Sequence, residues 1–383
     1  MRRQYSDFDI WMTIAVVLLM GFGLIMIGSA TRISILGESA AFRSQLIFIP
    51  LGLVIFAAAA FIDYHFIARF YVPIYLLCLL LLIATQIHGE LNDIAIRRWI
   101  HFNAGGFSLG IQPSEFAKVF MIIFLAKLLD TQGERINKIH MLAMVAVLVG
   151  APVWLIVQQP SLSAGVVVLV ICMTVMFVGN VGGRYVLFAM AVLTPIAIFL
   201  VYDFGRDEHI FLHYIARQYQ LDRIETLLNP ELADADSTFQ IQRSLQAIGS
   251  GQLVGQGLHQ GQITQSAGLP AAETDFIVSV IGEEFGFLGV MGVLLIMLLV
   301  VGRCFYIAAK APDMLGRLIA SGVTMMLAFQ TFVNVGVVTE LLPNTGVPFP
   351  FLSYGGSSLW ASLIAIGLVI NVNMTKAKSM FEI

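Results

Sequence analysis

The sequence predicts an all-α membrane protein with ten transmembrane helices, and two observations support this fold class. Only 12% of the 383 residues are charged and 58% are hydrophobic, whereas about 25% of the residues in a soluble domain are charged. The apolar residues are also gathered into runs of about 20, the length at which a helix crosses a hydrocarbon core of about 30 Å. We therefore expect one membrane domain over residues 1–383, within which residues 204–275 form a large extracytoplasmic loop.

The helices are expected, in chain order, where the apolar runs lie. These runs cover residues 10–30, 44–62, 70–87, 113–129, 140–157, 162–178, 184–203, 276–302, 314–338 and 355–374. The first run follows Met1-Arg2-Arg3 and is longer than the apolar region of a signal peptide, which spans about 7 to 15 residues. We expect it to remain in the protein as a membrane anchor.

The basic residues predict the orientation, because cytoplasmic loops of membrane proteins carry more Lys and Arg than outer loops. With a cytoplasmic N-terminus, twelve basic residues fall on the cytoplasmic side and only four in the short outer loops, namely Arg32, Arg43, Arg97 and Arg98. Ten spans then place both termini in the cytoplasm.

Composition and spacing exclude several classes of function. A net charge of −3 leaves no broad basic surface for nucleic acid. Cys78, Cys172 and Cys304 have no paired spacing, so no disulfide framework or zinc cluster is expected. The glycines of 249–261 lack the Gly-Lys-Ser/Thr ending of a nucleotide loop, and the histidines lack metal-ligand spacing.

Three outer segments are longer or more irregular than a connection requires: 88–112, 204–275 and 339–356. Within 211–228, apolar residues recur at near-helical spacing among charges, which is typical of a helix in the membrane interface. Farther on, Ser237 and Gln240 resemble a capping box and Gly249 a helix end. We expect the long loop to be structured. The alternative is a mobile linker.

Glu115 and Lys118 are ionisable residues at the outer start of the fourth span, where Pro113 suits a first helical turn. Their i, i+3 spacing places both charges on one helix face. They could simply neutralise each other so that the helix is tolerated in the bilayer. The alternative is a charge pair that faces a hydrated cavity.

Asp275 lies directly before the eighth span, and Glu283 and Glu284 follow about two turns later. Helix capping is the simplest role for Asp275. A partly desolvated carboxylate beside a cavity could instead serve as a general base. Glu283 and Glu284 are expected to have partners inside the bundle, for which Lys118 and Arg98 are candidates.

Residues 342–358 carry three prolines and a Gly-Gly pair between two apolar spans. Such a segment cannot continue as a helix. Irregular backbone at membrane depth is tolerated only where it is buried in protein or lines a cavity. We therefore expect a re-entrant turn that shapes a site, with simple packing as the alternative.

Four patches together make the chain similar to the SEDS family of cell-wall polymerases, the group that contains RodA, FtsW and SpoVE. The patches are Arg97-Arg98-Trp99-Ile100 with Gln112-Pro113-Ser114-Glu115 and Lys118; Gln159-Pro160; Thr274-Asp275-Phe276 with Ile281-Gly282-Glu283-Glu284; and Pro350 with Ser353-Tyr354-Gly355-Gly356-Ser357-Ser358. The resemblance covers essentially the whole chain. Residues 342–348 are closer to the elongation type and 281–284 to the division type, with a slight balance toward RodA.

The resemblance implies a peptidoglycan glycosyltransferase of the bacterial cytoplasmic membrane. Such an enzyme polymerises lipid II and works with a class B penicillin-binding protein in elongation, division or sporulation. The family's essential aspartate corresponds to Asp275, and its Glu and Lys on span four correspond to Glu115 and Lys118. Further substrate contacts are expected at Arg98, Trp99, Gln112, Ser114, Ser353, Gly355 and Gly356.

The implied chemistry is a direct displacement in which Asp275 takes a proton from the hydroxyl of the acceptor sugar. Lys118 and Arg98, or a divalent cation such as Mg²⁺ or Mn²⁺, are candidates to stabilise the diphosphate that leaves. No site with protein metal ligands is expected, and no other cofactor.

One position departs from the family pattern: many members read Gln-Pro-Asp where this chain has Gln159-Pro160-Ser161. The missing carboxylate removes one candidate contact to substrate or metal. Two other functions therefore stay open. One is a transporter that flips lipid II, because intramembrane charges and broken helices are also transporter features. The other is an inactive scaffold that recruits the transpeptidase.

Overall fold

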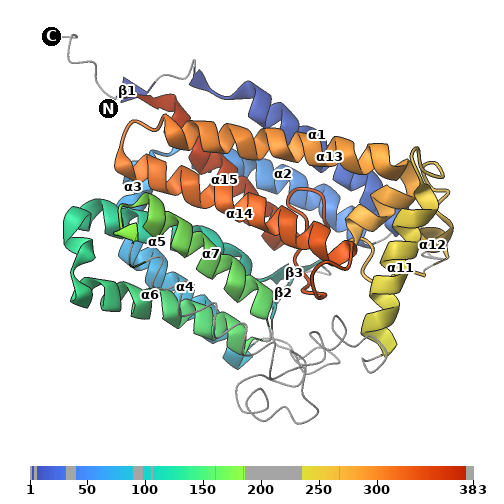
Figure 1. Ribbon diagram of the computed structural model, residues 1–383, viewed down its shortest axis with the longest axis horizontal. Coiled ribbons are helices and arrows are strands. Elements are labelled where there is room, and N and C mark those ends of the chain that lie inside the picture. Colours follow the sequence, from blue (N-terminus) through green and yellow to red (C-terminus); the bar gives the residue numbers. More distant parts are fainter. Residues whose placement is uncertain are drawn as a thin grey trace.

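The computed structural model describes residues 2–3, 7–31, 40–88, 98–104, 107–159, 161–183, 185, 235–266 and 268–376. Within these ranges the chain is a bundle of long helices, as the sequence predicts (Figure 1). The long helices are α1 (Ile10–Ala30), α2 (Ala40–Phe61), α4 (Tyr71–His88), α5 (Pro113–Gln132), α6 (Ile139–Gln158), α7 (Leu162–Val178), α13 (Ile277–Ala309), α14 (Met314–Val338) and α15 (Gly356–Met374).

These helices coincide with nine of the ten predicted spans; the seventh, 184–203, lies outside the described residues except for Tyr185. Six of the described helices are long and apolar enough to cross a membrane, and α4 and α7 are shorter apolar helices. The chain is therefore a multi-pass membrane protein, while the total of ten spans stays a prediction. Helix α13 ends at Ala309, seven residues beyond the predicted end of the eighth span at 302.

The remaining elements are short. They are α3 (Tyr64–Arg69), η2 (Gly133–Asn137), α11 (Ala235–Gly251), α12 (Gln262–Gln265) and the strands β1 (Arg2–Arg3), β2 (Ile100–Ala104), β3 (Phe107–Ile111) and β4 (Thr375–Lys376). Strands β2 and β3 form an antiparallel hairpin that leads into α5, and β1 pairs with β4. The all-α fold class is confirmed, with two small two-stranded sheets added to it in the described part of the chain.

Helix α15 forms the centre of the bundle, and 83% of the residues in its most apolar 18-residue stretch are buried. It packs closely on α2 because both helices carry glycines at the crossing: a Cβ on Gly52 would lie 2.6 Å from Leu363, and one on Gly367 would lie 2.7 Å from Ala59. Small residues allow helix backbones to approach in this way. On the outer helix α6, by contrast, Trp154 is 61% exposed, as expected for a side chain that contacts lipid.

Both termini lie at one end of the bundle, where β1 meets β4 (Figure 1). The same end holds α3, whose buried Tyr64 donates a hydrogen bond of 2.8 Å to Oδ1 of Asp313. Burial raises the pKa of the Tyr64 phenol above its ordinary value, and the adjacent carboxylate of Asp313 raises it further, so the hydroxyl keeps its proton. The shared end is consistent with termini on one side of the membrane; that this side is cytoplasmic stays a prediction.

Helix α11 differs from the predicted segment that begins at Ser237 and ends at Gly249. It starts two residues earlier and ends two residues later, at Gly251. The later end has a packing reason: a Cβ on Gly251 would lie 1.9 Å from the carbonyl oxygen of Gly282, so the last turn of α11 docks directly on α13. The predicted interfacial helix over 211–228 lies outside the described residues.

Candidate functional site

Asp275 lies in a tight turn directly before α13. The turn closes when the backbone N–H groups of Thr274 and Phe276 donate to the carbonyl of Ala271, at 3.1 and 3.3 Å, and Ala271 has a φ of 53°. The N-cap of α13 is Phe276, which is fully buried, and not Asp275. Asp275 is therefore not the N-cap residue that local sequence favoured, and its carboxylate is half-buried.

The segment between α14 and α15 covers this turn. Ser353 Oγ donates to the carbonyl of Thr274 at 2.6 Å, and the N–H of Tyr354 donates to that of Glu273 at 2.8 Å. A Cβ on Gly346 would lie 3.2 Å from Oδ2 of Asp275, so the backbone of this segment lies against the carboxylate. The predicted irregular turn packed in the protein is thus confirmed, while its role in shaping a site stays a prediction.

The amino acids of this covering segment, residues 339–355, explain its path. Gly346 and Gly355 have φ values of 67° and 151°, which a glycine adopts without steric cost. Phe349 and Leu352 are fully buried and anchor the segment in the bundle. Close packing at Gly23, where a Cβ would lie 2.6 Å from the carbonyl oxygen of Leu352, joins it to α1.

Glu115 and Lys118 form the ion pair that their spacing predicts. Lys118 Nζ lies 2.7 Å from Oε2 of Glu115, and the two side chains are only 3% and 6% exposed. The neighbouring Ser114 is buried as well. The N–H of Gln112 donates to Oγ of Ser357 at 2.9 Å, which ties the start of α5 to the start of α15 beside Gly356.

Arg98 is bonded to a different part of the bundle from the Glu115–Lys118 pair. Its Nε donates to the carbonyl of Gln159 at 3.2 Å, and the Gln159 side chain donates to the carbonyl of Leu82 at 2.8 Å. Arg98 is thus tied to the end of α6, with Trp99 half-buried next to it. The neighbouring Arg97 lies outside the described residues.

The two glutamates of α13 have partners other than those considered from the sequence. Glu283 accepts hydrogen bonds from the N–H groups of Ile263 and Thr264, at 2.7 and 2.9 Å, and from the Thr264 hydroxyl at 2.6 Å. Glu284 accepts one from Ser29 Oγ at 2.5 Å. The pairing with Lys118 or Arg98 is therefore wrong: Lys118 pairs with Glu115, and Glu283 caps the short helix α12.

The position that departs from the family pattern lies near the covering segment. Ser161 is 7% exposed and directly precedes α7. Two residues later, Ser163 Oγ donates to the carbonyl of Thr345 at 2.7 Å, next to Gly346. No feature of the sequence indicated this contact. The substitution of a serine for an aspartate therefore falls beside the segment that covers Asp275.

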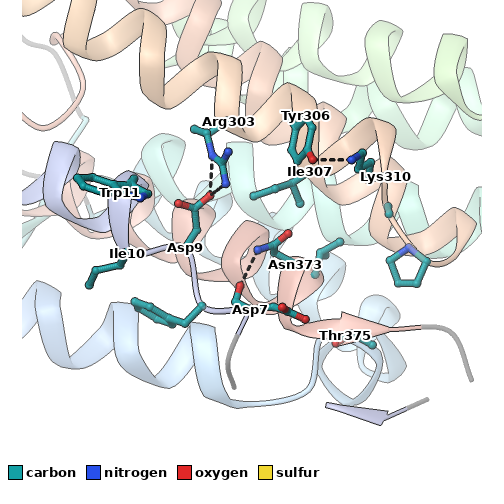
Figure 2. Close-up of a pocket in the computed structure, with 14 residues that line it drawn as sticks. Asp7, Asp9, Ile10, Trp11, Arg303, Tyr306, Ile307, Lys310, Asn373 and Thr375 are labelled. Atoms are coloured by element: carbon teal, nitrogen blue, oxygen red, sulfur yellow. Dashed lines mark hydrogen bonds and ion pairs between the residues drawn. The ribbon is translucent and has the colours of Figure 1, made fainter. Parts of the chain in front are cut away.

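A separate cavity of about 770 Å³ lies at the other end of α13, near the chain termini (Figure 2). Its walls carry the ion pair between Arg303 and Asp9, at 2.6 Å, and the hydrogen bond from Lys310 to Tyr306, at 2.5 Å. The part of α13 that lines the cavity begins at Arg303, near the end of the helix at Ala309, whereas Asp275 precedes the start of the helix at Ile277. None of the predicted site residues lines this cavity.

Metal binding was considered for the leaving diphosphate. Among the residues that the structure describes, no group of three or more His, Cys, Asp or Glu side chains is arranged to hold a metal ion. Magnesium usually takes one or two carboxylates together with substrate phosphates. A Mg²⁺ ion bound in that way would not need a group of three such side chains.

Known proteins resemble the chain over nearly its full length. It is 34% identical over 380 residues to "Probable peptidoglycan glycosyltransferase FtsW" of Trichlorobacter lovleyi, covering 97% of this chain and 94% of that protein. It is 35% identical over 379 residues to "Stage V sporulation protein E" of Bacillus subtilis, covering 97% and 99%.

A solved structure described as "Structural coordination of polymerization and crosslinking by a peptidoglycan synthase complex" contains a chain with the same fold. The two chains are 31% identical, the TM-score is 0.76, and the match covers 96% of this chain and 97% of that one. The model of the FtsW, RodA and SpoVE family, described as "Cell cycle protein", matches residues 10–378. The chain therefore belongs to the FtsW, RodA and SpoVE family.

Proposed function

We propose that the chain is a peptidoglycan glycosyltransferase that polymerises lipid II into glycan strands at the outer face of the cytoplasmic membrane, with Asp275 as the general base. The observation that carries the proposal is the placement of Asp275: a half-buried carboxylate just before α13, directly under the covering segment. The family relatives named as peptidoglycan glycosyltransferases support the reaction class.

The reaction needs one group to accept a proton and others to stabilise the negative charge of the leaving diphosphate. The hydroxyl oxygen of the acceptor sugar forms a bond to the anomeric carbon of the donor, while the bond from that carbon to the diphosphate oxygen breaks. The hydroxyl proton passes to the carboxylate of Asp275. The diphosphate leaves with the electron pair of the broken bond.

Lys118 and Arg98 are the cations that we propose to stabilise this diphosphate. Lys118 is held by Glu115 at 2.7 Å, which keeps its ammonium group in one position inside the bundle. Arg98 is held through its Nε. Trp99, Gln112, Ser114, Ser353, Gly355 and Gly356 complete the proposed substrate contacts.

We further propose that a class B penicillin-binding protein is the partner and that both termini are cytoplasmic. The solved relative comes from a peptidoglycan synthase complex, which supports a transpeptidase partner. The pairing of β1 with β4 brings both termini to one end, and Asp275 precedes the opposite end of α13. With cytoplasmic termini, Asp275 would face the outer leaflet.

The direct test uses purified protein, alone and with its transpeptidase, and labelled lipid II. The proposal expects glycan chains from the native protein and none from Asp275→Ala. Translocation of labelled lipid in vesicles that persists in Asp275→Ala, with no polymer from either protein, would instead establish a flippase. Absence of both activities even with the partner present would establish a scaffold, and Ser161→Asp then tests whether the departing position is responsible.

A further inference from the structure

A single buried amide connects the backbone of Asp275 to the segment that covers it. Asn334 lies on α14, one turn before the helix ends, and is 1% exposed. Its Nδ2 donates to the carbonyl of Asp275 at 2.9 Å and to the carbonyl of Val347 at 2.8 Å. Because both partners are carbonyl oxygens, only the NH₂ end of the amide can face them, and its two hydrogens are both used.

The other end of this amide argues against a role in packing alone. Oδ1 of Asn334 is buried and has no hydrogen-bond partner among the described residues. A buried acceptor without a donor lowers stability, and an apolar side chain at this place would avoid that cost. The two bonds made by Nδ2 are therefore the feature of Asn334 that an apolar residue could not supply.

These two bonds join the backbone of Asp275 to that of the covering segment. One holds the residue that bears the carboxylate, and the other holds Val347, the neighbour of Gly346, whose backbone lies against Oδ2 of Asp275. The same amide thus bridges the backbones of Asp275 and of its cover. The bonds from Ser353 and Tyr354 reach the two preceding residues, Thr274 and Glu273.

We propose that Asn334 is a positioning residue of the transfer reaction: it holds the Asp275 carboxylate at the distance from the covering segment that proton transfer requires. The inference rests on the proposed role of Asp275. A general base acts over a heavy-atom distance of about 2.6 to 3.2 Å. Misplacement by about 1 Å can cost about 100-fold in rate.

The first test compares Asn334→Ala and Asn334→Asp with the native protein in the lipid II polymerisation assay with the transpeptidase present. We expect kcat to fall by roughly 10- to 100-fold, with a change in KM of less than about threefold because Asn334 does not touch the substrate. Asn334→Asp keeps the shape but has no N–H donors, so we expect no rescue. The acid limb of the pH–rate profile should also shift, since the surroundings of the base change.

A matched control is available at the other end of the bundle. Asn371 is fully buried on α15, and its Nδ2 likewise bridges two backbone carbonyls, those of Ala59 and Ile62. Asn371→Ala should lower the melting temperature as Asn334→Ala does, but kcat per folded molecule and the pH profile should stay native. If Asn334→Ala does not fold, Asn334→Ser, which keeps one donor, takes its place with an intermediate loss expected.

Two outcomes would overturn the inference, and they are distinguishable through Asp275→Asn measured in the same assay. If Asp275→Asn abolishes polymerisation while the Asn334 variants retain kcat within twofold and keep the native pH profile, Asn334 has no positioning role and the proposed function stands. If Asp275→Asn polymerises at the native rate, the proposed base is wrong and the positioning role fails with it.

Discussion

Glu115 and Lys118 form a buried ion pair that is also part of the proposed site. Their charges lie almost entirely out of solvent, 2.7 Å apart. Removing one partner of a buried pair leaves an uncompensated charge, whereas removing both leaves none. The comparison of single and double variants therefore separates the contribution to stability from a contribution to the reaction.

We predict that Lys118→Met lowers the free energy of unfolding by about 3 to 5 kcal/mol. Glu115→Gln combined with Lys118→Met should recover most of this loss, because neither charge is then left alone. The double variant should still fail to polymerise lipid II. Thermal unfolding and the polymerisation assay on the same samples check both statements, and native activity in the double variant would reduce the pair to a packing role.

Gly346 has a backbone conformation that favours glycine and also lies next to the carboxylate of Asp275. Its φ of 67° is unfavourable for a residue with a Cβ, and that Cβ would lie 3.2 Å from Oδ2 of Asp275. We predict that Gly346→Ala lowers stability by about 1 to 3 kcal/mol and lowers the polymerisation rate at least tenfold. Gly133→Ala is the control, because Gly133 has a φ of 52° but no atom within 4 Å of its Cβ position. Gly133→Ala should lower stability but not the polymerisation rate. An equal loss of polymerisation rate in both variants would contradict the prediction.

At the scale of elements, α13 is broken where the segment between α11 and α12 inserts into it. Gly286 has a φ of 65° and a ψ of −164°, outside the helical region. The carbonyls of Glu283 and Glu284 accept hydrogen bonds from the N–H groups of Gln256 and Gly257, both at 2.9 Å. In turn, the N–H groups of Phe287 and Leu288 donate to the carbonyls of residues 252 and 253, at 2.8 and 3.0 Å. Residues 252–257 therefore replace the missing turn of the helix.

This insertion predicts a sharp difference between two glycines of the same helix. A Cβ on Gly286 would lie 2.4 Å from the backbone nitrogen of Gly255, whereas a Cβ on Gly292 meets no atom within 4 Å. Gly286→Ala should displace residues 252–257 and lower stability by more than about 2 kcal/mol. Gly292→Ala should be neutral or slightly stabilising, since alanine is the better helix former. Hydrogen exchange of the amides of residues 256, 257, 287 and 288 reports the displacement, and equal protection in both variants would refute it.

The same elements show why sequence alone predicted the helices but not their junctions. The thickness of the bilayer sets the length of an apolar run that crosses it. Such runs can be recognised in the sequence, and nine of the predicted spans match described helices. The break at Gly286 is invisible because residues 276–302 read as one apolar run, and the partners of Glu283 lie about 20 residues away along the chain. Asn334 was overlooked as a lone amide in an apolar span. The cost of burying a polar group there was the signal that could have identified it.

At the scale of the whole molecule, the site and the termini lie at opposite ends of α13, so the account requires one orientation in the membrane. Leu341 and Ile139 are 76% and 75% exposed and lie at the ends of the bundle predicted to be outer and cytoplasmic. We predict that Leu341→Cys in cells reacts with an impermeant maleimide, whereas Ile139→Cys reacts only after permeabilisation. Background should be low because Cys78, Cys172 and Cys304 are buried. The reverse pattern would place Asp275 on the cytoplasmic side and contradict the account.

The most direct measurement is the initial rate of glycan synthesis from labelled lipid II by Asp275→Asn beside the native protein, both in complex with the transpeptidase. The substitution keeps the size of the side chain and removes only its ability to accept a proton at neutral pH. The account predicts a rate at least about 100-fold lower, with the variant still folded and still bound to its partner. A variant that elongates glycan strands at the native rate would contradict it.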